Sequence, residues 1–266
     1  MALGLHGCGE PVAKVHEAGT PEGMVAELVE AYTPLDRTVT SDVEDAKFVR
    51  QLKVLDQCSQ GGEEVGRVAL ERLRQPHERI VGVERALLMV AARAATKDTQ
   101  PLLEKLVLEY GSALELRTEA ALLLAEVAPE RALEILEPMI TKTKQTMTMP
   151  PAEFLVRAWV IACERTGRSP VPALADVATN LYQEGAARVR AVKELGRHKD
   201  PRSEAALRTI LVESTGDGYL RRMAAQSLHA ILPAEMACAL FNEVASKEAD
   251  MNFLRFLANA LDLWCK

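Results

Sequence analysis

The sequence lacks several features that mark common classes of protein. No stretch approaches the roughly 20 consecutive apolar residues of a membrane-spanning helix, and aromatic residues make up only 4% of the chain. There is no GxGxxG or GxxxxGK[ST] phosphate loop, no HExxH zinc motif and no GxSxG nucleophile elbow. We therefore predict no cofactor, no metal and no enzymatic activity.

Cysteine is scarce and its pattern is not that of a metal site. No two cysteines form a CxxC, and their number is odd. Cys163 and Cys238 fall on the apolar sides of expected helices, which is typical of small buried hydrophobes. Reduced thiols suit a reducing compartment better than a disulfide framework does, so we expect a cytoplasmic protein. The five are Cys8, Cys58, Cys163, Cys238 and Cys265.

The first residues leave two interpretations open. Leu5-His6-Gly7-Cys8 resembles the end of a bacterial lipoprotein signal, in which a small residue precedes the lipidated cysteine. Only seven residues precede Cys8 and none is Lys or Arg, whereas a secretory signal needs a charged region and an apolar core of about 7–15 residues. Either the match is accidental, or the true start lies upstream and Cys8 attaches a lipoprotein scaffold to the membrane.

The charge is acidic and uneven. Residues 1–60 hold ten Asp or Glu and five Lys or Arg, a net of -5, so the rest of the chain carries -1 of the total of -6. Wrapping a nucleic-acid duplex requires a basic stripe that displaces counterions. We therefore expect no nucleic acid among the partners.

Apolar anchors recur at a nearly constant interval. Six leucines follow one another at steps of 33, 33, 38, 33 and 33 residues, and a second series keeps the same interval about twenty residues earlier. A stack of similar helical units produces such spacing, because each unit buries its face against the next. The leucines are Leu70, Leu103, Leu136, Leu174, Leu207 and Leu240, and the second series is Arg50, Val83, Leu116, Leu155, Ala187, Leu220 and Phe253.

One unit shows the local pattern clearly. In segment 187–196 the apolar residues have helical spacing, and Gly196 stands where a helix C-cap is expected. Asp200-Pro201 then reads as an N-cap followed by proline at the first helical position. Each repeat is therefore predicted to consist of a first helix, a tight turn and a second helix.

This pattern, V/L-R-x-x-A-x-x-x-L-G followed by D-P and a leucine-rich helix, resembles the short bacterial HEAT repeat that also occurs in phycobilisome lyases. Segments 116–124 and 220–228 fit it, and the resemblance covers about residues 44–266. It implies an all-α fold, a right-handed α-solenoid superhelix of about six to seven HEAT-like helix-turn-helix repeats. The Trp-Leu-Gly-Tyr spacing of tetratricopeptide repeats and the Thr-Pro-Leu-His signature of ankyrin repeats are both missing.

We predict an N-terminal segment, 1–40, with a capping helix at about 21–33, and one continuous repeat array at 41–266. Segment 141–151 is rich in threonine and closes on two prolines, which indicates an extended loop between units. First helices are expected near 44–58, 78–96, 114–127, 152–166, 185–196, 218–231 and 251–264. Second helices are expected near 63–74, 99–110, 130–141, 171–184, 202–214 and 234–247.

Three acids share the repeat interval. Glu71, Glu104 and Glu137 each follow a leucine of the series, so a stack aligns them in a row roughly 10 Å apart. We call these three residues the glutamate row. Arg72 and Lys105 follow the first two and oppose their charge. The row is either a solvated face or, together with Arg72 and Lys105, a site for a basic segment of a protein partner.

Arginines recur at the start of the first helices. In HEAT-like arrays such arginines join adjacent units together with turn aspartates, here Asp98 and Asp200. Charge-assisted hydrogen bonds between Arg and Asp suit that role. The arginines are Arg117, Arg157, Arg188, Arg221 and Arg255.

From these observations we predict a non-enzymatic scaffold or adaptor that binds a protein partner on its concave face, lined by second helices. One alternative is an enzyme or enzyme accessory of the HEAT-repeat lyase type; another is the membrane-anchored lipoprotein. DNA glycosylase activity is disfavoured because HEAT-like glycosylases need a basic groove with exposed aromatic residues. Neither the partner nor the oligomeric state follows from the sequence.

Overall fold

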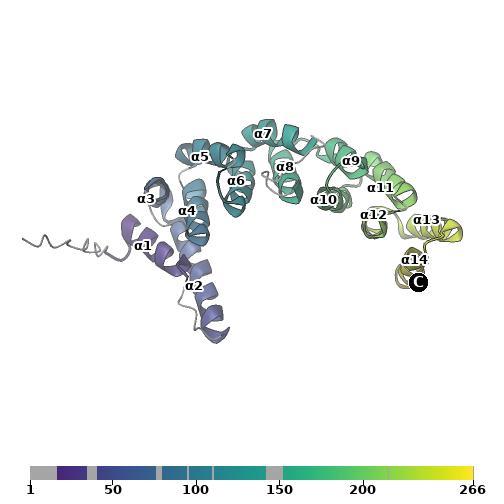
Figure 1. Cartoon of the computed structure of the whole chain (residues 1–266), viewed down its shortest axis with the longest axis horizontal. Coiled ribbons are helices and arrows are strands. Elements are labelled where there is room, and N and C mark those ends of the chain that lie inside the picture. The colour runs from purple at the N-terminus through teal and green to yellow at the C-terminus, as the bar shows by residue number, and fades with distance from the viewer. Residues whose placement is uncertain are drawn as a thin grey trace, which may run out of the picture. The chain divides into compact units, whose positions relative to one another are not determined.

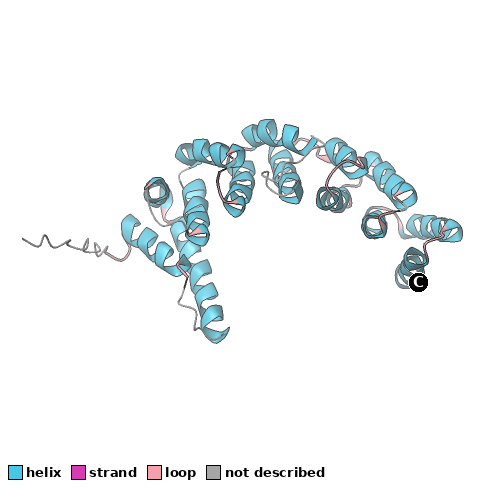
Figure 2. Cartoon of the chain, viewed as in Figure 1, coloured by secondary structure: helices cyan, strands magenta, loops and turns pink. Residues whose placement is uncertain are grey.

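A computed structural model describes residues 17–34, 41–75, 80–94, 96–109, 111–141, 152–214 and 216–265. These residues form fourteen α-helices and no strand (Figure 2), so the fold is all-α as predicted. No helix among them has the length and apolar character that a membrane span requires. In chain order they are α1 (Pro21–Tyr32), α2 (Ser41–Gln60), α3 (Gly62–Arg74), α4 (Val81–Ala94), α5 (Thr96–Leu108), α6 (Leu114–Val127), α7 (Pro129–Thr141), α8 (Ala152–Thr166), α9 (Val171–Thr179), α10 (Gly185–Leu195), α11 (Pro201–Glu213), α12 (Gly218–Ile231), α13 (Ala234–Lys247) and α14 (Met251–Trp264).

The predicted alternation of first and second helices is confirmed. Helices α6, α8, α12, α13 and α14 have the predicted bounds, and all six leucines of the series are buried. The Asp200 carboxylate accepts a hydrogen bond from the backbone N–H of Arg202 at 2.7 Å, so it is the N-cap of α11. Helix α9 ends earlier than predicted, where Asn180 Oδ1 accepts from the backbone N–H of Tyr182 in a turn.

The chain divides into two compact units, Met1–Thr99 and Gln100–Lys266. In the first unit α1 packs against α2, α3 and α4, and these three also pack against one another. Val25, Leu28 and Ala31 of α1 are buried in this cluster. The capping helix is therefore one member of a four-helix cluster, and the predicted division at residue 40 remains a prediction.

In the second unit the helices form two parallel rows (Figure 1). The first helices pack in sequence, α6 on α8, α8 on α10, α10 on α12 and α12 on α14. Within this unit the row of second helices α7, α9, α11 and α13 follows the outer side of a curve, and the first helices follow its inner side. The expectation that second helices line the concave side is therefore wrong for this unit.

Two cysteines correct the expectation of reduced core thiols. Cys238 and Cys265, 27 residues apart, form a disulfide that joins α13 to the end of α14. Cys163 is free and buried as expected, Cys58 is also free and buried, and burial raises the pKa of each thiol to about 11. Cys8 and most of the predicted loop, residues 142–151, lie outside the described residues.

The close packing of α10 on α12 depends on one glycine. A Cβ added to Gly196 would lie 2.6 Å from Ser227 Oγ, and that hydroxyl donates to the carbonyl of Val192 at 3.0 Å. The φ of Gly196 is -65°, which any residue adopts. Glycine is needed here for the close approach of two helices, not for a left-handed C-cap.

We expect Gly196→Ala to lower the free energy of unfolding by about 1–3 kcal/mol, the usual cost of overpacking a close contact. Urea unfolding followed by circular dichroism measures the loss. Gly185→Ala is the matched control, because it lies in the same helix and its added Cβ meets no atom within 4 Å. Equal stability of the two variants would show that α10 and α12 do not meet as described.

Candidate functional site

Three buried arginines join consecutive helical repeats. Each lies near the start of a first helix and donates to backbone carbonyls near the end of the preceding second helix. Arg117 donates to Leu106 and Val107, Arg188 to Ala178 at 3.1 Å and Arg221 to Leu211 at 2.8 Å.

This bonding has a clear physical cause. The last four carbonyls of a helix have no partner within the helix, and the negative end of the helix dipole favours a cation there. The predicted linking role is confirmed for Arg117, Arg188 and Arg221. It is wrong for Arg157 and Arg255, which are exposed, and the acceptors are carbonyls, not the predicted aspartates.

Two carboxylates of the glutamate row form ion pairs with arginines of the next repeat. Arg131 Nε lies 3.0 Å from Glu104 Oε2, and Arg168 donates to both carboxylate oxygens of Glu137, at 2.7 and 2.9 Å. The pKa of Glu104 is lowered, chiefly by a hydrogen bond from Gln100 and to a smaller extent by the hydrogen bond and charge of Arg131. These two carboxylates link repeats and are not free anions.

The remaining residues of the predicted binding site are exposed. Glu71 lies on α3, in the first unit, next to Arg72, whose Nη1 donates to Gln75 at 3.3 Å. Lys105 lies on α5. The role of these residues in binding a basic segment remains a prediction.

One concave site lies between α11 and α13. It is a pocket of about 570 Å³ whose apolar wall comes from second helices and whose polar end comes from α12 and the turn before α14. We call it the α11–α13 pocket. Its lining residues are Val212, Arg221, Leu240, Glu243, Val244, Lys247, Glu248, Ala249 and Asp250.

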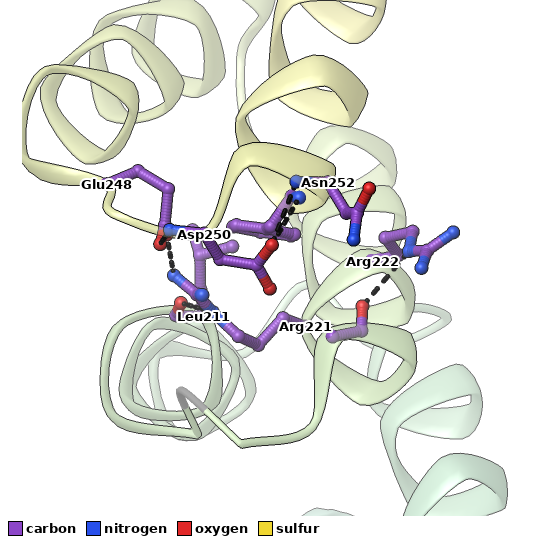
Figure 3. Close-up of polar contacts among 8 residues, drawn as sticks. Leu211, Arg221, Arg222, Glu248, Asp250 and Asn252 are labelled. Atoms are coloured by element: carbon purple, nitrogen blue, oxygen red, sulfur yellow. Dashed lines mark hydrogen bonds and ion pairs between the residues drawn. The ribbon is translucent and has the colours of Figure 1, made fainter.

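Arg221 organises the polar end of this pocket (Figure 3). Its Nη2 donates to Glu248, its Nε donates to the carbonyl of Leu211, and its guanidinium carbon lies 3.9 Å from the centre of the Phe253 ring. Only 3% of the Arg221 side chain and 7% of that of Glu248 are exposed. The pair is thus a buried ion pair supported by a cation–π contact.

The carboxylates around Arg221 are already satisfied. Glu248 Oε1 accepts from the backbone N–H of Asp250 at 2.8 Å, and Asp250 Oδ1 caps α14 by accepting from Asn252 and Phe253. At the rim Lys247 binds Glu243 at 2.8 Å. Arg221 Nη1 differs, because this buried donor has no hydrogen-bond partner in the described part of the chain. The pocket therefore combines an apolar wall with a polar end, where Arg221 keeps one buried N–H donor without a partner among the described residues.

The ion pair also sets the protonation of Glu248. The hydrogen bond from Arg221 lowers the pKa of this carboxyl; burial opposes the effect, and the backbone N–H of Asp250 adds to it. Glu248 is therefore an anion in the folded protein at neutral pH. No group of three or more His, Cys, Asp or Glu side chains in the described ranges is placed to hold a metal ion.

Comparison with known proteins gives little beyond the fold. No protein-family model matches the chain, and no curated protein matches it. Among solved structures it is similar to human deoxyhypusine hydroxylase in complex with glycerol, at 15% identity and a TM-score of 0.40, over 92% of this chain and 95% of the other. A likeness this distant assigns no reaction and no site residue to this chain.

The similar structure nevertheless corrects two predictions. Its name is that of an enzyme, whereas the sequence led us to predict a non-enzymatic protein and a binding scaffold. We retain neither prediction. The chain is an all-α helical repeat protein.

Sequence reasoning did not find the α11–α13 pocket. Arg221 was assigned a structural role, and nothing marked Glu248, 27 residues later, as its partner. The residue 27 positions after the equivalent arginine, Arg117, is Lys144 in the sequence, so the acid is not part of the repeat pattern. An acid that breaks the repeat opposite a repeated arginine is the signal that was available.

Breaking the buried pair from one side leaves a buried charge without a partner. We expect Arg221→Met to lower the free energy of unfolding by about 3–5 kcal/mol, and Arg221→Met with Glu248→Met to lose less. The folded pKa of Glu248 is depressed, so the pair contributes stability above the ordinary pKa of about 4.5 and loses it as pH falls through the folded value.

Urea unfolding between pH 7 and pH 2.5 tests both points. The stability gap between the native chain and Glu248→Gln should narrow below about pH 4. Glu243→Gln is the matched control, because this carboxylate forms its ion pair with Lys247 at the exposed rim. A gap that stays constant with pH would contradict the described ion pair.

Proposed function

We propose that the protein takes part in an enzyme-catalysed reaction, as the enzyme or as its accessory, and that the α11–α13 pocket holds the ligand. We also propose that its repeats are of the short bacterial HEAT type, on the strength of the sequence pattern. The observation that carries the ligand site is the buried Arg221 Nη1 at the end of an apolar pocket.

A buried donor without a partner favours a specific ligand. Leaving such a group unsatisfied costs free energy, which an acceptor on a ligand recovers. Val212, Leu240 and Val244 supply apolar surface beside it. Pockets with an apolar wall and a few fixed polar groups are the usual form of small-molecule sites.

The surrounding charges define the chemical class of the ligand. An anionic head group would face the carboxylates of Glu243, Glu248 and Asp250, while an ammonium group has no acceptor to offer Arg221. A neutral carbonyl oxygen accepts from Nη1 without either penalty. The proposed ligand is therefore an apolar molecule with a neutral carbonyl or amide group.

Three probes of matched shape test the site: cyclohexanecarboxamide, cyclohexanecarboxylate and cyclohexylmethylamine. Nitrogen-15 NMR of the protein should show the amide probe shifting the Arg221 side-chain signals, with at least tenfold weaker binding of the charged probes. Val212→Trp should abolish the shifts by filling the pocket from a half-exposed position. Val49→Trp, the same change at an exposed valine of α2, should leave them intact.

The outcomes separate the parts of the proposal. Binding of none of the probes would overturn the site, and equal binding of all three would remove the role of Arg221. For the reaction, metabolite extracts incubated with the native chain or Val212→Trp are compared by mass spectrometry. If the native chain, but not Val212→Trp, converts a metabolite, the protein is an enzyme. If the native chain binds a metabolite and leaves it chemically unchanged, the protein is an accessory. If the two chains give the same result, both proposals are contradicted.

A further inference from the structure

Four arginines on the first helices lie outside the buried set Arg117, Arg188 and Arg221. Arg157, Arg190, Arg222 and Arg255 lie on α8, α10, α12 and α14, at steps of 33, 32 and 33 residues. We call them the arginine row. Arg157, Arg222 and Arg255 are exposed and Arg190 is about one third exposed. The repeat interval therefore places one cation on each of four consecutive first helices.

These arginines are mostly available to a partner. Arg157 and Arg255 make no hydrogen bond or ion pair with the described residues, and Arg222 donates only to the Gly218 carbonyl of its own helix. Arg190 binds the buried carboxylate of Glu194, which also accepts from Arg197. Arg197 Nη2 also lies 3.8 Å from Glu164 Oε1, so the acids balance the charges here, and the cations of the row that remain for a partner are Arg157, Arg222 and Arg255.

A shallow hollow lies beside Arg190, between three of these helices. It measures about 490 Å³ and brings together α8, α10 and the start of α12. Arg190 and Lys193 provide its cations, and the exposed ring of Tyr219 lies at its edge. Of its two acids, Asp217 is occupied as the N-cap of α12 and Glu153 lies at the start of α8.

We propose that the arginine row binds an acidic polypeptide segment in extended conformation. Packed helices lie roughly 8–10 Å apart, and an extended chain advances about 3.3 Å per residue. An acid at every third residue therefore meets one arginine per helix. Helix α6 marks the end of this surface, because it carries the exposed Glu115 in place of a cation.

The charge pattern favours a polypeptide over nucleic acid. Nucleic-acid binding of useful strength draws on many phosphate contacts, whereas this face offers four arginines and Lys193, with Glu194 and Glu153 between them. Isolated cations at a regular spacing suit isolated carboxylates at the same spacing. This inference is independent of the α11–α13 pocket, which α11, α13 and the turn before α14 form.

Fluorescence anisotropy with labelled twelve-residue peptides tests the spacing. We expect the peptide (Glu-Ser-Gly)4 to bind about tenfold more tightly than a peptide of the same composition with its four glutamates in one block. Replacing Arg157, Arg222 and Arg255 by Gln should weaken binding of the spaced peptide by about tenfold, because each exposed pair contributes modestly.

The matched control replaces Arg67, Arg72 and Arg202 by Gln, which removes the same charge from exposed positions outside the row. It should keep binding within about twofold of the native chain, since screening limits long-range effects at physiological salt. Equal weakening by both triple variants, or equal binding of both peptides, would overturn the proposal. Tighter binding of twelve-residue oligothymidine than of the spaced peptide would assign the surface to nucleic acid instead.

Discussion

The second unit depends on one recurring interaction, the buried arginine that reaches from the start of a first helix to the end of the preceding second helix. Arg117, Arg188 and Arg221 donate to backbone carbonyls that otherwise have no partner. Because these carbonyls are buried, leaving them unsatisfied is costly. Each arginine thereby fixes the position of a first helix relative to the second helix before it.

This constraint also explains where the two surfaces of interest lie. The first helices pack in sequence along the inner side of the second unit, and four of them carry the arginine row. The second helices follow the outer side, and between α11 and α13 a pocket remains. Arg221 forms the polar end of that pocket because it reaches from the start of α12 to the end of α11.

Much of the fold was predictable because its signals are local. The helical spacing of apolar residues, Gly196 and the Asp200-Pro201 pair act within one or two turns of helix, and they located the bounds of α10 and α11 to within a few residues. The candidate site was not predictable in the same way. The Arg221–Glu248 pair, the Glu104–Arg131 bridge and the disulfide join residues 27 apart, and nothing in the interval itself says which of them meet.

Arg221 and Arg222 show the boundary between the two kinds of information. The sequence alone determined that the chain is a stack of paired helices and that an arginine recurs at each start, because periodicity fixes which face of a helix is apolar. Only the tertiary structure decided that Arg221 is buried and Arg222 exposed. One residue rotates a side chain by about 100° around a helix, and the packing of neighbouring helices determines which of two adjacent arginines meets carbonyls and which meets solvent.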